Sequence, residues 1–360
     1  MTGEEKRKIL SEAVLIIPSL NPDQLFVDTV CAMSAEGFSR ILVVNDGSAP
    51  ENLWAFEAAE QKTGCTVIGY DVNQGKGHAL KYAFEYVLEN YQGAYGVVTC
   101  DGDGQHSPED CVNVALRLHD CGNKIIFGAR DFTKENVPKR NRFGNVVTRT
   151  IFNLLYNLKI DDAQTGLRGI PYSALPLMLT VEGERFEYES NVLIAIADEH
   201  IPYVNLPIST IYIEGNRRSH FRVIRDSYRV YKPVILYLLS ALSSAVIDLG
   251  IFTALMAVLN LSDHDKNVLI ATITARIISS LYNYAVNRNA VFKSKEPGRK
   301  TVVRYYILAA CQMLISYKGV SLLTAALGIT GVVTALIKFA VDAVLFFFSF
   351  RIQRKWVFAK

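Results

Sequence analysis

The sequence predicts two parts of different fold class: an α/β domain with a mostly parallel, Rossmann-like sheet, followed by a bundle of four transmembrane helices. Three observations support this prediction. Short apolar runs alternate with helical patterns in residues 1–215, four long apolar stretches fill the last third, and half of the 360 residues are hydrophobic while 20% are charged. This composition excludes a disordered or nucleic-acid-coating chain, which would be rich in charge and poor in apolar residues.

Four short apolar runs near the start of the chain are typical of buried strands. They cover residues 13–18, 41–45, 66–70 and 95–100. Helical patterns separate these runs at residues 22–37, 50–63 and 77–91. Strand–helix–strand alternation at this spacing predicts a parallel sheet, in which ligands bind at the carboxyl ends of the strands.

Polar residues follow each of the four runs, and they predict a nucleotide site. They are Pro18-Ser-Leu-Asn21, Asn45-Asp46-Gly47-Ser48, Asp71-Val-Asn73-Gln-Gly75-Lys76 and Asp101-Gly-Asp103-Gly-Gln105. A Walker A loop is excluded because five residues separate Gly69 from Gly75 and because Gly77 replaces the hydroxyl residue. A dinucleotide fold is excluded because no GxGxxG motif follows the first run.

The Asp-x-Asp pair after the fourth run carries the chemistry. Asp101 and Asp103, with the amide of Gln105, are hard oxygen ligands of the kind that Mg²⁺ or Mn²⁺ prefers. Such an ion can bridge a diphosphate and neutralise a departing nucleoside diphosphate. An Asp-x-Asp pair alone is common in loops, but its place after an apolar fourth strand makes the signal specific.

Residues 13–232 resemble the inverting family 2 glycosyltransferases of the GT-A fold. The string DGDGQH at 101–106 is similar to the DADxQH of dolichyl-phosphate mannosyltransferases and bacterial polyprenyl-phosphate glycosyltransferases. The resemblance implies metal-dependent transfer of a hexose from a nucleotide sugar, of GDP-mannose or UDP-glucose type, to a polyprenyl or dolichyl phosphate at the cytosolic face of a membrane.

The same resemblance implies roles for individual residues. The nucleotide sugar would contact Pro18, Asn21, Asp46, Asn73, Gly75, Lys76 and Asp101, and the metal would bind Asp101, Asp103 and Gln105. The catalytic residues would be Asp103 with Asp162 and Arg168 of a D-x-x-T-G-x-R segment. The acceptor phosphate would meet Arg130, Arg142, Arg218, Ser219, His220 and Arg222.

Several of these assignments have alternatives. His220 stands where the family has a lysine, which puts the usual phosphate contact in doubt. Lys76 has the alternative of a solvated loop lysine, and Asp162 with Arg168 that of a buried salt bridge. His106 is interpreted as a hydrogen-bonded structural residue rather than a metal ligand.

Four apolar stretches, at 233–259, 267–286, 305–327 and 329–350, are each long enough to cross a hydrocarbon core of ~30 Å. Sixteen Lys and Arg residues lie in three flanking segments, at 217–232, 287–304 and 351–360, whereas the opposite loops hold only Lys266. The positive-inside rule therefore predicts an integral membrane protein with both termini and the catalytic domain in the cytosol, at the plasma membrane if the source is prokaryotic.

The membrane part also repeats. NRNAVF at 287–292 is echoed by QRKWVF at 353–358, a shift of 66 residues, which predicts two parallel helical hairpins. This arrangement resembles the GtrA-like membrane domain, whose members are implicated in handling lipid-linked sugars. The predicted domains are therefore residues 1–215, a basic amphipathic interfacial helix at 216–232, and a GtrA-like domain at 233–360. A homo-oligomer through the membrane domain is left open.

The basic helix has the alternative of a solvated helix packed on the soluble domain. Charged residues inside the apolar stretches are costly and normally pair within a bundle. The predicted pairs are Asp248 with Lys318 and Arg276 with Asp342; the competing arrangement joins Lys338 to Asp342, one helical turn apart.

Three rival functions remain. A processive polysaccharide synthase would carry Gln-x-x-Arg-Trp before its spans, but the similar string here, Gln353-Arg-Lys-Trp356, has another spacing and follows the last span. A protein glycosyltransferase leaves the membrane module unexplained. A lipid-linked-sugar transporter whose accessory glycosyltransferase domain is a degenerate sensor would have lost the Asp-x-Asp pair, but Asp101 and Asp103 are both present.

Overall fold

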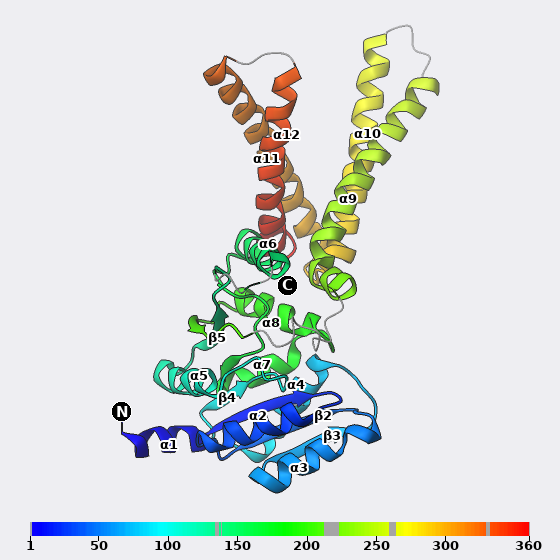
Figure 1. The fold of residues 1–360 in the computed structure, drawn as a ribbon. Coiled ribbons are helices and arrows are strands. Elements are labelled where there is room, and N and C mark those ends of the chain that lie inside the picture. The colour runs from blue at the N-terminus through cyan, green and yellow to red at the C-terminus, as the bar shows by residue number, and fades with distance from the viewer. Residues whose placement is uncertain are drawn as a thin grey trace. The chain divides into compact units, whose positions relative to one another are not determined.

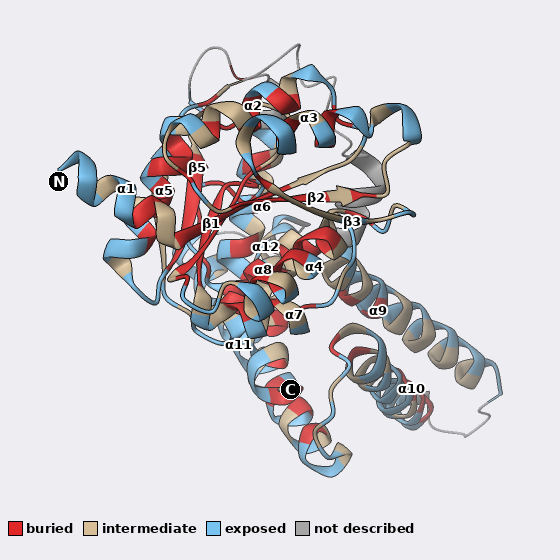
Figure 2. Cartoon of the chain, turned by 90° about the horizontal axis from the view of Figure 1, so that it is seen from below, coloured by how far each residue is buried: buried red, intermediate tan, exposed pale blue. Residues whose placement is uncertain are grey.

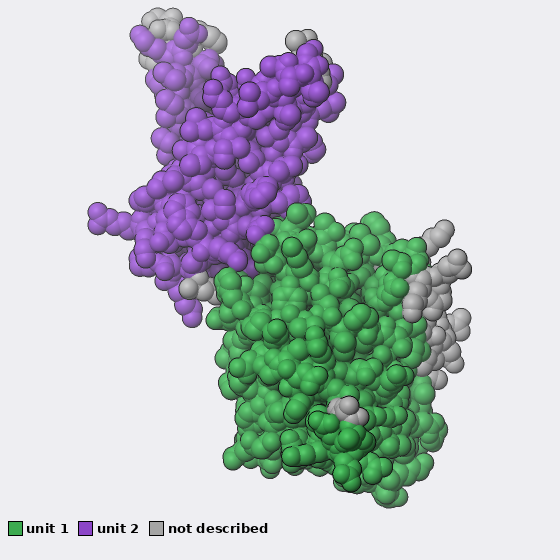
Figure 3. Space-filling view, turned by 90° about the vertical axis from the view of Figure 1, so that its left-hand side faces the viewer, with its two compact units in different colours: residues 1–230 green, residues 231–360 purple. Residues whose placement is uncertain are grey.

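The computed structural model describes residues 2–133, 137, 139–211, 223–258, 264–328 and 332–359. The chain forms two compact units, Met1–Val230 and Tyr231–Lys360 (Figure 3). The first unit contains a sheet, and the second contains long apolar helices.

The first unit is built on a seven-stranded sheet with the order β3-β2-β1-β4-β6-β5-β7 (Figure 1). The strands are β1 Ala13–Ser19, β2 Ile41–Asp46, β3 Thr66–Tyr70, β4 Gly96–Thr99, β5 Ile125–Arg130, β6 Arg168–Pro171 and β7 Tyr203–Ile208. All pairings are parallel except those of β6, which runs antiparallel to both β4 and β5. The predicted mostly parallel α/β sheet is therefore confirmed.

Helices cover both faces of this sheet. The helices of the first unit are α1 Gly3–Glu12, α2 Gln24–Ala35, α3 Trp54–Thr63, α4 Lys76–Asn90, α5 Pro108–Cys121, α6 Lys139–Tyr156, α7 Leu175–Thr180 and α8 Glu187–Asp198. Figure 2 shows α2 and α3 on one face and α4, α7 and α8 on the other. Strand β1 is buried along Ala13–Ile17 because it is covered on both sides, as expected for a parallel sheet.

Local chemistry explains where the helices near the site begin. Asp23 caps α2 by accepting a hydrogen bond from Leu25 N–H, and Ser107 caps α5 by accepting one from Asp110 N–H. Helix α4 instead begins after Gly75, whose φ of 108° suits glycine and which has no side chain to act as a cap. The free N–H groups at the start of α4 must therefore bond to other groups, which lie in the candidate site.

The reversed direction of β6 shapes that site. The residues that precede a parallel strand lie at the amino edge of the sheet. Because β6 runs in the opposite direction, the residues that precede β6 lie at the carboxyl edge instead. Thr99 at the end of β4 pairs with Arg168 at the start of β6, and Thr99 Oγ1 donates to Gly166 O at 2.8 Å. The D-x-x-T-G-x-R segment therefore lies beside the residues that follow β4.

The second unit consists of two helical hairpins. They are formed by α9 Val223–Val258 with α10 His264–Val286, and by α11 Gly298–Leu327 with α12 Val332–Ile352 (Figure 1). Within the described residues, three helical stretches are long and apolar enough to cross a membrane: Lys232–Val258, Asp265–Val291 and Gly298–Leu327. Helix α12 is not one of these three, but its 21 residues give a length of about 31 Å, which is long enough to cross a membrane. The fourth span therefore stays a prediction.

Both hairpins end in the same way, as the 66-residue repeat predicts. Asn287–Val291 and Gln353–Val357 are both π-helical turns. Asn287 Nδ2 donates to Gln353 Oε1 at 3.1 Å, and the rings of Phe292 and Phe358 stack at 5.4 Å. Equivalent positions of the two hairpins therefore contact each other directly.

The predicted pairing of the membrane charges was wrong. Arg276 Nη2 lies 3.2 Å from Asp248 Oδ2, and Lys338 Nζ lies 2.7 Å from Asp342 Oδ2. The first pair joins the two helices of one hairpin, and the second joins neighbouring turns of α12, as the competing arrangement proposed. The Nζ of Lys318 lies 5.6 Å from the centre of the Tyr317 ring instead. These partners depend on how each helix is rotated about its own axis. The spacing of the apolar residues constrains that rotation poorly here.

Candidate active site

The segments after β1 and β2 are tied together by hydrogen bonds. Asn21, at a φ of 51°, donates its N–H to Ser48 Oγ at 2.8 Å and accepts from Ala49 N–H through Oδ1 at 2.8 Å. Pro18 lies in β1, in register with Val44 of β2. These contacts fix the edge of the sheet at which a nucleoside was predicted to bind.

Asp46 holds the loop that follows β3. Its carboxylate, in a residue that is only 5% exposed, accepts hydrogen bonds at 2.7–3.1 Å. The donors are Tyr70 Oη, Asn73 Nδ2, Gln74 N and Gly75 N. Burial and the bond to Asp46 raise the pKa of Tyr70. The carboxylate is thus hydrogen-bonded within the protein, and its predicted contact with the nucleoside stays a prediction.

Residues 184–185 close this loop from the other side. A Cβ on Gly75 would lie 2.6 Å from Glu184 O, and Arg185 Nη1 donates to Asn73 Oδ1 at 3.2 Å. Glu184 O also accepts from His78 N–H at 2.9 Å, which satisfies a free amide at the start of α4. The amide of Asn73 is thereby used at both ends, by Asp46 and by Arg185.

Lys76 lies between two carboxylates. Its Nζ is 2.6 Å from Asp101 Oδ1 and 3.0 Å from Glu189 Oε1, and its side chain is 17% exposed. Burial disfavours the ammonium, but the charges of Asp101 and Glu189 outweigh it and raise the pKa of Lys76. The alternative of a solvated loop lysine was therefore wrong.

Asp101 and Asp103 have opposite electrostatic environments. Burial disfavours the Asp101 carboxylate, but the charge of Lys76 and the nearby His106 outweigh it and lower the pKa of Asp101. Burial and the charge of Asp101 raise the pKa of Asp103. The Oδ1 of Asp103 accepts from Gln105 N–H at 3.1 Å. His106 is buried beside Asp101, with Nε2 3.6 Å from Oδ2, in keeping with a structural residue.

The donor set fits a divalent cation that shares its coordination with a substrate. Among the residues that the structure describes, no three His, Cys, Asp or Glu side chains gather as a complete metal site. Asp101 and Asp103 present hard oxygen atoms at one strand end, and a cation would relieve both the burial of the Asp103 carboxylate and its repulsion by Asp101, which together raise its pKa. Mg²⁺ characteristically binds through one or two carboxylates plus substrate phosphates and water.

The D-x-x-T-G-x-R segment packs directly on Asp101. A Cβ on Gly166 would collide with the Asp101 carboxylate, which would then have to move. The buried Asp162 forms a two-pronged ion pair with Arg130, with Nε–Oδ2 at 2.6 Å and Nη2–Oδ1 at 3.3 Å. The alternative of a buried bridge between Asp162 and Arg168 was therefore wrong.

Arg168 has other partners. It is 4% exposed and lies over the Phe127 ring, while its Nε donates to Thr165 O at 3.1 Å and its Nη1 to Glu189 O at 3.2 Å. Arg168 therefore ties the turn before β6 to the start of α8. Its Nη2 is buried without a hydrogen-bond partner among the described residues.

The predicted acceptor site is only partly described. Arg142 lies exposed on α6, and its Nη2 donates to Thr133 O at 3.2 Å. Arg218, Ser219, His220 and Arg222 lie outside the described residues. The basic helix at 216–232 also stays a prediction, because the side chains of 223–231 are not described either.

Sequence reasoning missed Glu189 and Arg185. Both lie near the start of α8, next to Tyr188, whose buried ring fills the space above Gly77. Two glutamates flanking an aromatic residue at 187–189 were a weak signal of a helix start near a site. Nothing local connected them to Lys76, which lies on a distant helix.

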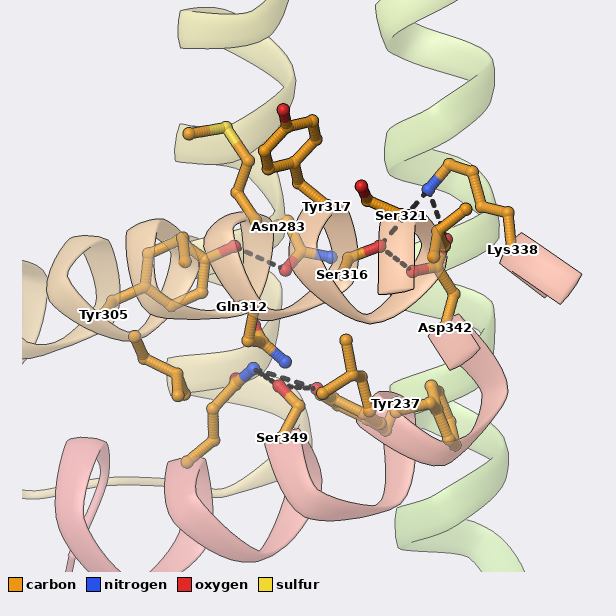
Figure 4. A pocket seen from close by; sticks show the side chains of 17 residues that line it. Tyr237, Asn283, Tyr305, Gln312, Ser316, Tyr317, Ser321, Lys338, Asp342 and Ser349 are labelled. Atoms are coloured by element: carbon orange, nitrogen blue, oxygen red, sulfur yellow. Dashed lines mark hydrogen bonds and ion pairs between the residues drawn. The ribbon is translucent and has the colours of Figure 1, made fainter. Parts of the chain in front are cut away.

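A second polar site lies inside the membrane unit (Figure 4). A cavity of about 740 Å³ is bounded by α9, α10, α11 and α12. Most of its lining is apolar, and hydroxyl and amide groups form the rest, among them Tyr237, Asn283, Tyr305, Gln312, Ser316 and Ser349. Tyr305 Oη donates to Asn283 Oδ1 at 2.7 Å, and the Lys338–Asp342 pair lies at its other end.

Two parts of the chain match families of known proteins. Residues 15–176 match the family described as Glycosyl transferase family 2, and residues 236–358 match the GtrA/DPMS transmembrane domain. The UDP-N-acetylglucosamine–dolichyl-phosphate N-acetylglucosaminyltransferase of Methanococcus voltae is 28% identical over 221 residues, 56% of this chain and 86% of that protein. The glycosyltransferase AglJ of Haloferax volcanii is 26% identical over 218 residues, 60% and 68% of the two chains.

A solved structure is also similar in part. Glucosyl-3-phosphoglycerate synthase from Mycobacterium tuberculosis, in complex with Mn²⁺, UDP and glucosyl-3-phosphoglycerate, superposes with a TM-score of 0.48. The match has 15% sequence identity and covers 67% of this chain and 84% of that one.

Proposed function

We propose that this chain is a membrane glycosyltransferase, in which a family 2 glycosyl transferase domain is joined to a GtrA/DPMS transmembrane domain, and that it transfers a hexose from a nucleotide sugar to a polyprenyl or dolichyl phosphate. The observation that carries the proposal is the Asp101–Asp103 pair facing the 162–168 segment, in a chain that also has membrane helices. One relative supports the lipid acceptor, since its name includes dolichyl-phosphate.

The proposed cofactor is Mg²⁺ or Mn²⁺, held by Asp101 and Asp103, with Gln105 as a further oxygen ligand. Bound there, the ion would neutralise charge on the departing diphosphate. The nucleotide sugar, of GDP-mannose or UDP-glucose type, would lie along the carboxyl ends of β1, β2 and β4. In this arrangement Asp46 acts through the 73–75 loop that it holds, rather than by touching the nucleoside.

The acceptor needs little help from a general base. A phosphate monoester has a second pKa near 6, so it is largely dianionic at neutral pH and already nucleophilic. The protein must bring two anions together and hold them in line, which is catalysis by positioning and charge. We assign this task to Arg130 and Arg168. Arg130 is held by its ion pair with Asp162, and Arg168 by its hydrogen bond to Thr165 O.

The proposed reaction has a direct assay. The full-length chain in detergent, incubated with polyprenyl phosphate and a panel of radiolabelled nucleotide sugars, should move label into organic solvent only with a divalent metal. Transfer that persists in excess EDTA would contradict the metal requirement. Label that reaches polysaccharide or protein but no lipid would favour the rival acceptors.

A second function is favoured by the membrane cavity. Its hydroxyl and amide lining suits a polyhydroxylated group, and an apolar hollow of about 700 Å³ adjoins it and shares Gln312 and Ser349. We propose that the membrane domain handles the lipid-linked sugar that the first domain makes. In reconstituted vesicles, Gln312→Leu should slow the appearance of product on the far leaflet, whereas Leu322→Ala on the exposed face of α11 should not. Equal rates for both variants would oppose this role.

A further inference from the structure

The lysine at the start of α4 occupies an oxygen that a metal would need. Lys76 Nζ lies 2.6 Å from Asp101 Oδ1, which is a short charge-assisted hydrogen bond. A divalent ion bound at the Asp-x-Asp pair draws on the same carboxylate and carries the same sign of charge as the ammonium. The two cations therefore compete for Asp101, and this competition arises only if the proposed metal dependence holds.

A second acceptor for Lys76 is already in place. Glu189 Oε1 lies 3.0 Å from Nζ, and the glutamate side chain is only 15% exposed. The Lys76 side chain, which is long and flexible, can therefore leave Asp101 without losing a charged partner. An ammonium with no such partner would be costly to hold in a half-buried position.

Glu189 is itself firmly held. Its backbone carbonyl accepts from Arg168 Nη1 at 3.2 Å, and the neighbouring Tyr188 is 1% exposed, with Oη donating to Met178 O at 2.9 Å. The Tyr188 ring packs on Gly77, where an added Cβ would lie 2.5 Å from Tyr188 Cβ. The starts of α4 and α8 are thus in fixed contact, so a shift of Lys76 requires movement of its side chain alone.

We propose that Lys76 is an exchangeable counter-charge: it neutralises Asp101 when no metal is bound and transfers to Glu189 when a divalent cation reaches Asp101 and Asp103. Glu189 is then a positioning residue, which acts on the metal only through Lys76. This role differs from that of a general base, which would need contact with the acceptor.

The test is a double-mutant cycle on metal affinity. Mn²⁺ binding to the full-length chain in detergent is measured by electron paramagnetic resonance, without any sugar transfer, for wild type, Lys76→Met, Glu189→Gln and the double variant. Glu189→Gln should weaken Mn²⁺ binding about tenfold, or about 1.4 kcal/mol, because Lys76 then stays on Asp101. Lys76→Met should strengthen it, and adding Glu189→Gln to Lys76→Met should change it less than about twofold.

A matched ion pair on the same helix is the control. Lys81 Nζ lies 2.6 Å from Glu184 Oε1, one turn further along α4. Lys81→Met and Glu184→Gln should leave Mn²⁺ affinity unchanged. Thermal unfolding of each variant verifies folding, and Lys76→Gln replaces Lys76→Met if the latter is unstable.

Two outcomes would overturn the exchange. Equal weakening by Glu189→Gln with and without Lys76 would mean that Glu189 acts on the metal directly. No weakening at all would mean that Lys76 does not compete. In both cases Mn²⁺ still binds, so the proposed metal dependence survives, whereas a wild-type chain that binds neither Mn²⁺ nor Mg²⁺ would overturn both.

Discussion

Replacing Asp46 with asparagine should destabilise the first unit, because the carboxylate at the end of β2 organises the loop that leads into α4. The substituted side chain keeps one acceptor oxygen, but its amide nitrogen would face two donors, Asn73 Nδ2 and Gly75 N, that now bond to Oδ2 at 3.0 and 3.1 Å. Each donor keeps a second acceptor, Asp46 O at 3.2 Å for Asn73 and Oδ1 at 3.0 Å for Gly75. Hydrogen bonds to charged groups contribute about 1.5–3 kcal/mol each, so losing two of them at the lower end of this range gives a net loss of about 3 kcal/mol.

This loss should appear in thermal unfolding. For a unit of about 230 residues, 1 kcal/mol corresponds to a shift of roughly 2–4 °C, so Asp46→Asn should lower the Tm of the first unit by about 6–12 °C. The chain has two tryptophans, Trp54 on α3 and Trp356 in the other unit. In a Trp356→Phe background, Trp54 fluorescence reports the first unit alone.

Asp71→Asn is the matched control, since it removes the same charge from an exposed position of the same loop. It should shift the Tm by less than about 2 °C. If Asp46→Asn also shifts the Tm by less than about 2 °C, the hydrogen bonds to the Asp46 carboxylate do not hold the loop. The reasoning about Asp46 would then fail, and a direct contact with the nucleoside would become the better explanation of its position.

Three further predictions concern the metal pair and the membrane charges. Asp103→Ala should abolish most sugar transfer and weaken Mn²⁺ binding without lowering the Tm, as measured by the lipid-partition assay and calorimetry. Gly166→Ala should reduce Mn²⁺ affinity and transfer at least about tenfold, since its Cβ would collide with the adjacent carboxylate, whereas Gly144→Ala, where that Cβ meets open space, should be neutral. Exchanging Asp248 and Arg276 should restore membrane expression that either single charge reversal lowers, as scored by fluorescence-detected gel filtration.

Each of these has a contradicting result. A folded Asp103→Ala chain with full activity would remove the metal from the mechanism. Normal Mn²⁺ binding by Gly166→Ala would show that the 162–168 segment does not press on the metal pair. A charge-exchanged chain that expresses no better than the single reversals would show that the Asp248–Arg276 pair is incidental.

The parts of this molecule that could be predicted are those with a local signature. Alternating apolar runs and helical patterns revealed the parallel sheet, and the polar residues after β1, β2 and β4 indicated which edge carries the site. The antiparallel β6 was not foreseen, because a four-residue strand has too short a pattern to reveal its direction.

The side-chain partners could not be predicted, for a related reason. Lys76 meets Glu189, and Asp162 meets Arg130, only after the sheet has assembled. Such pairs depend on packing between elements far apart in the chain. In the membrane unit, the apolar stretches predicted the helices, but the rotation that brings Asp248 to Arg276 follows from contacts between helices.

The reversed strand β6 also bears on how the chain acquires activity during folding. Because β6 inserts between β4 and β5, the site depends on pairs separated by 67 residues for Thr99 and Gly166 and by 112 for Asn73 and Arg185. Contacts between residues so far apart in the chain are expected to form late, because closing the long intervening loop costs conformational entropy. A nascent chain that has formed only β1 to β4 thus has the Asp-x-Asp pair but not the 162–168 segment that packs on it. The site is completed only when the last strands of the sheet have formed.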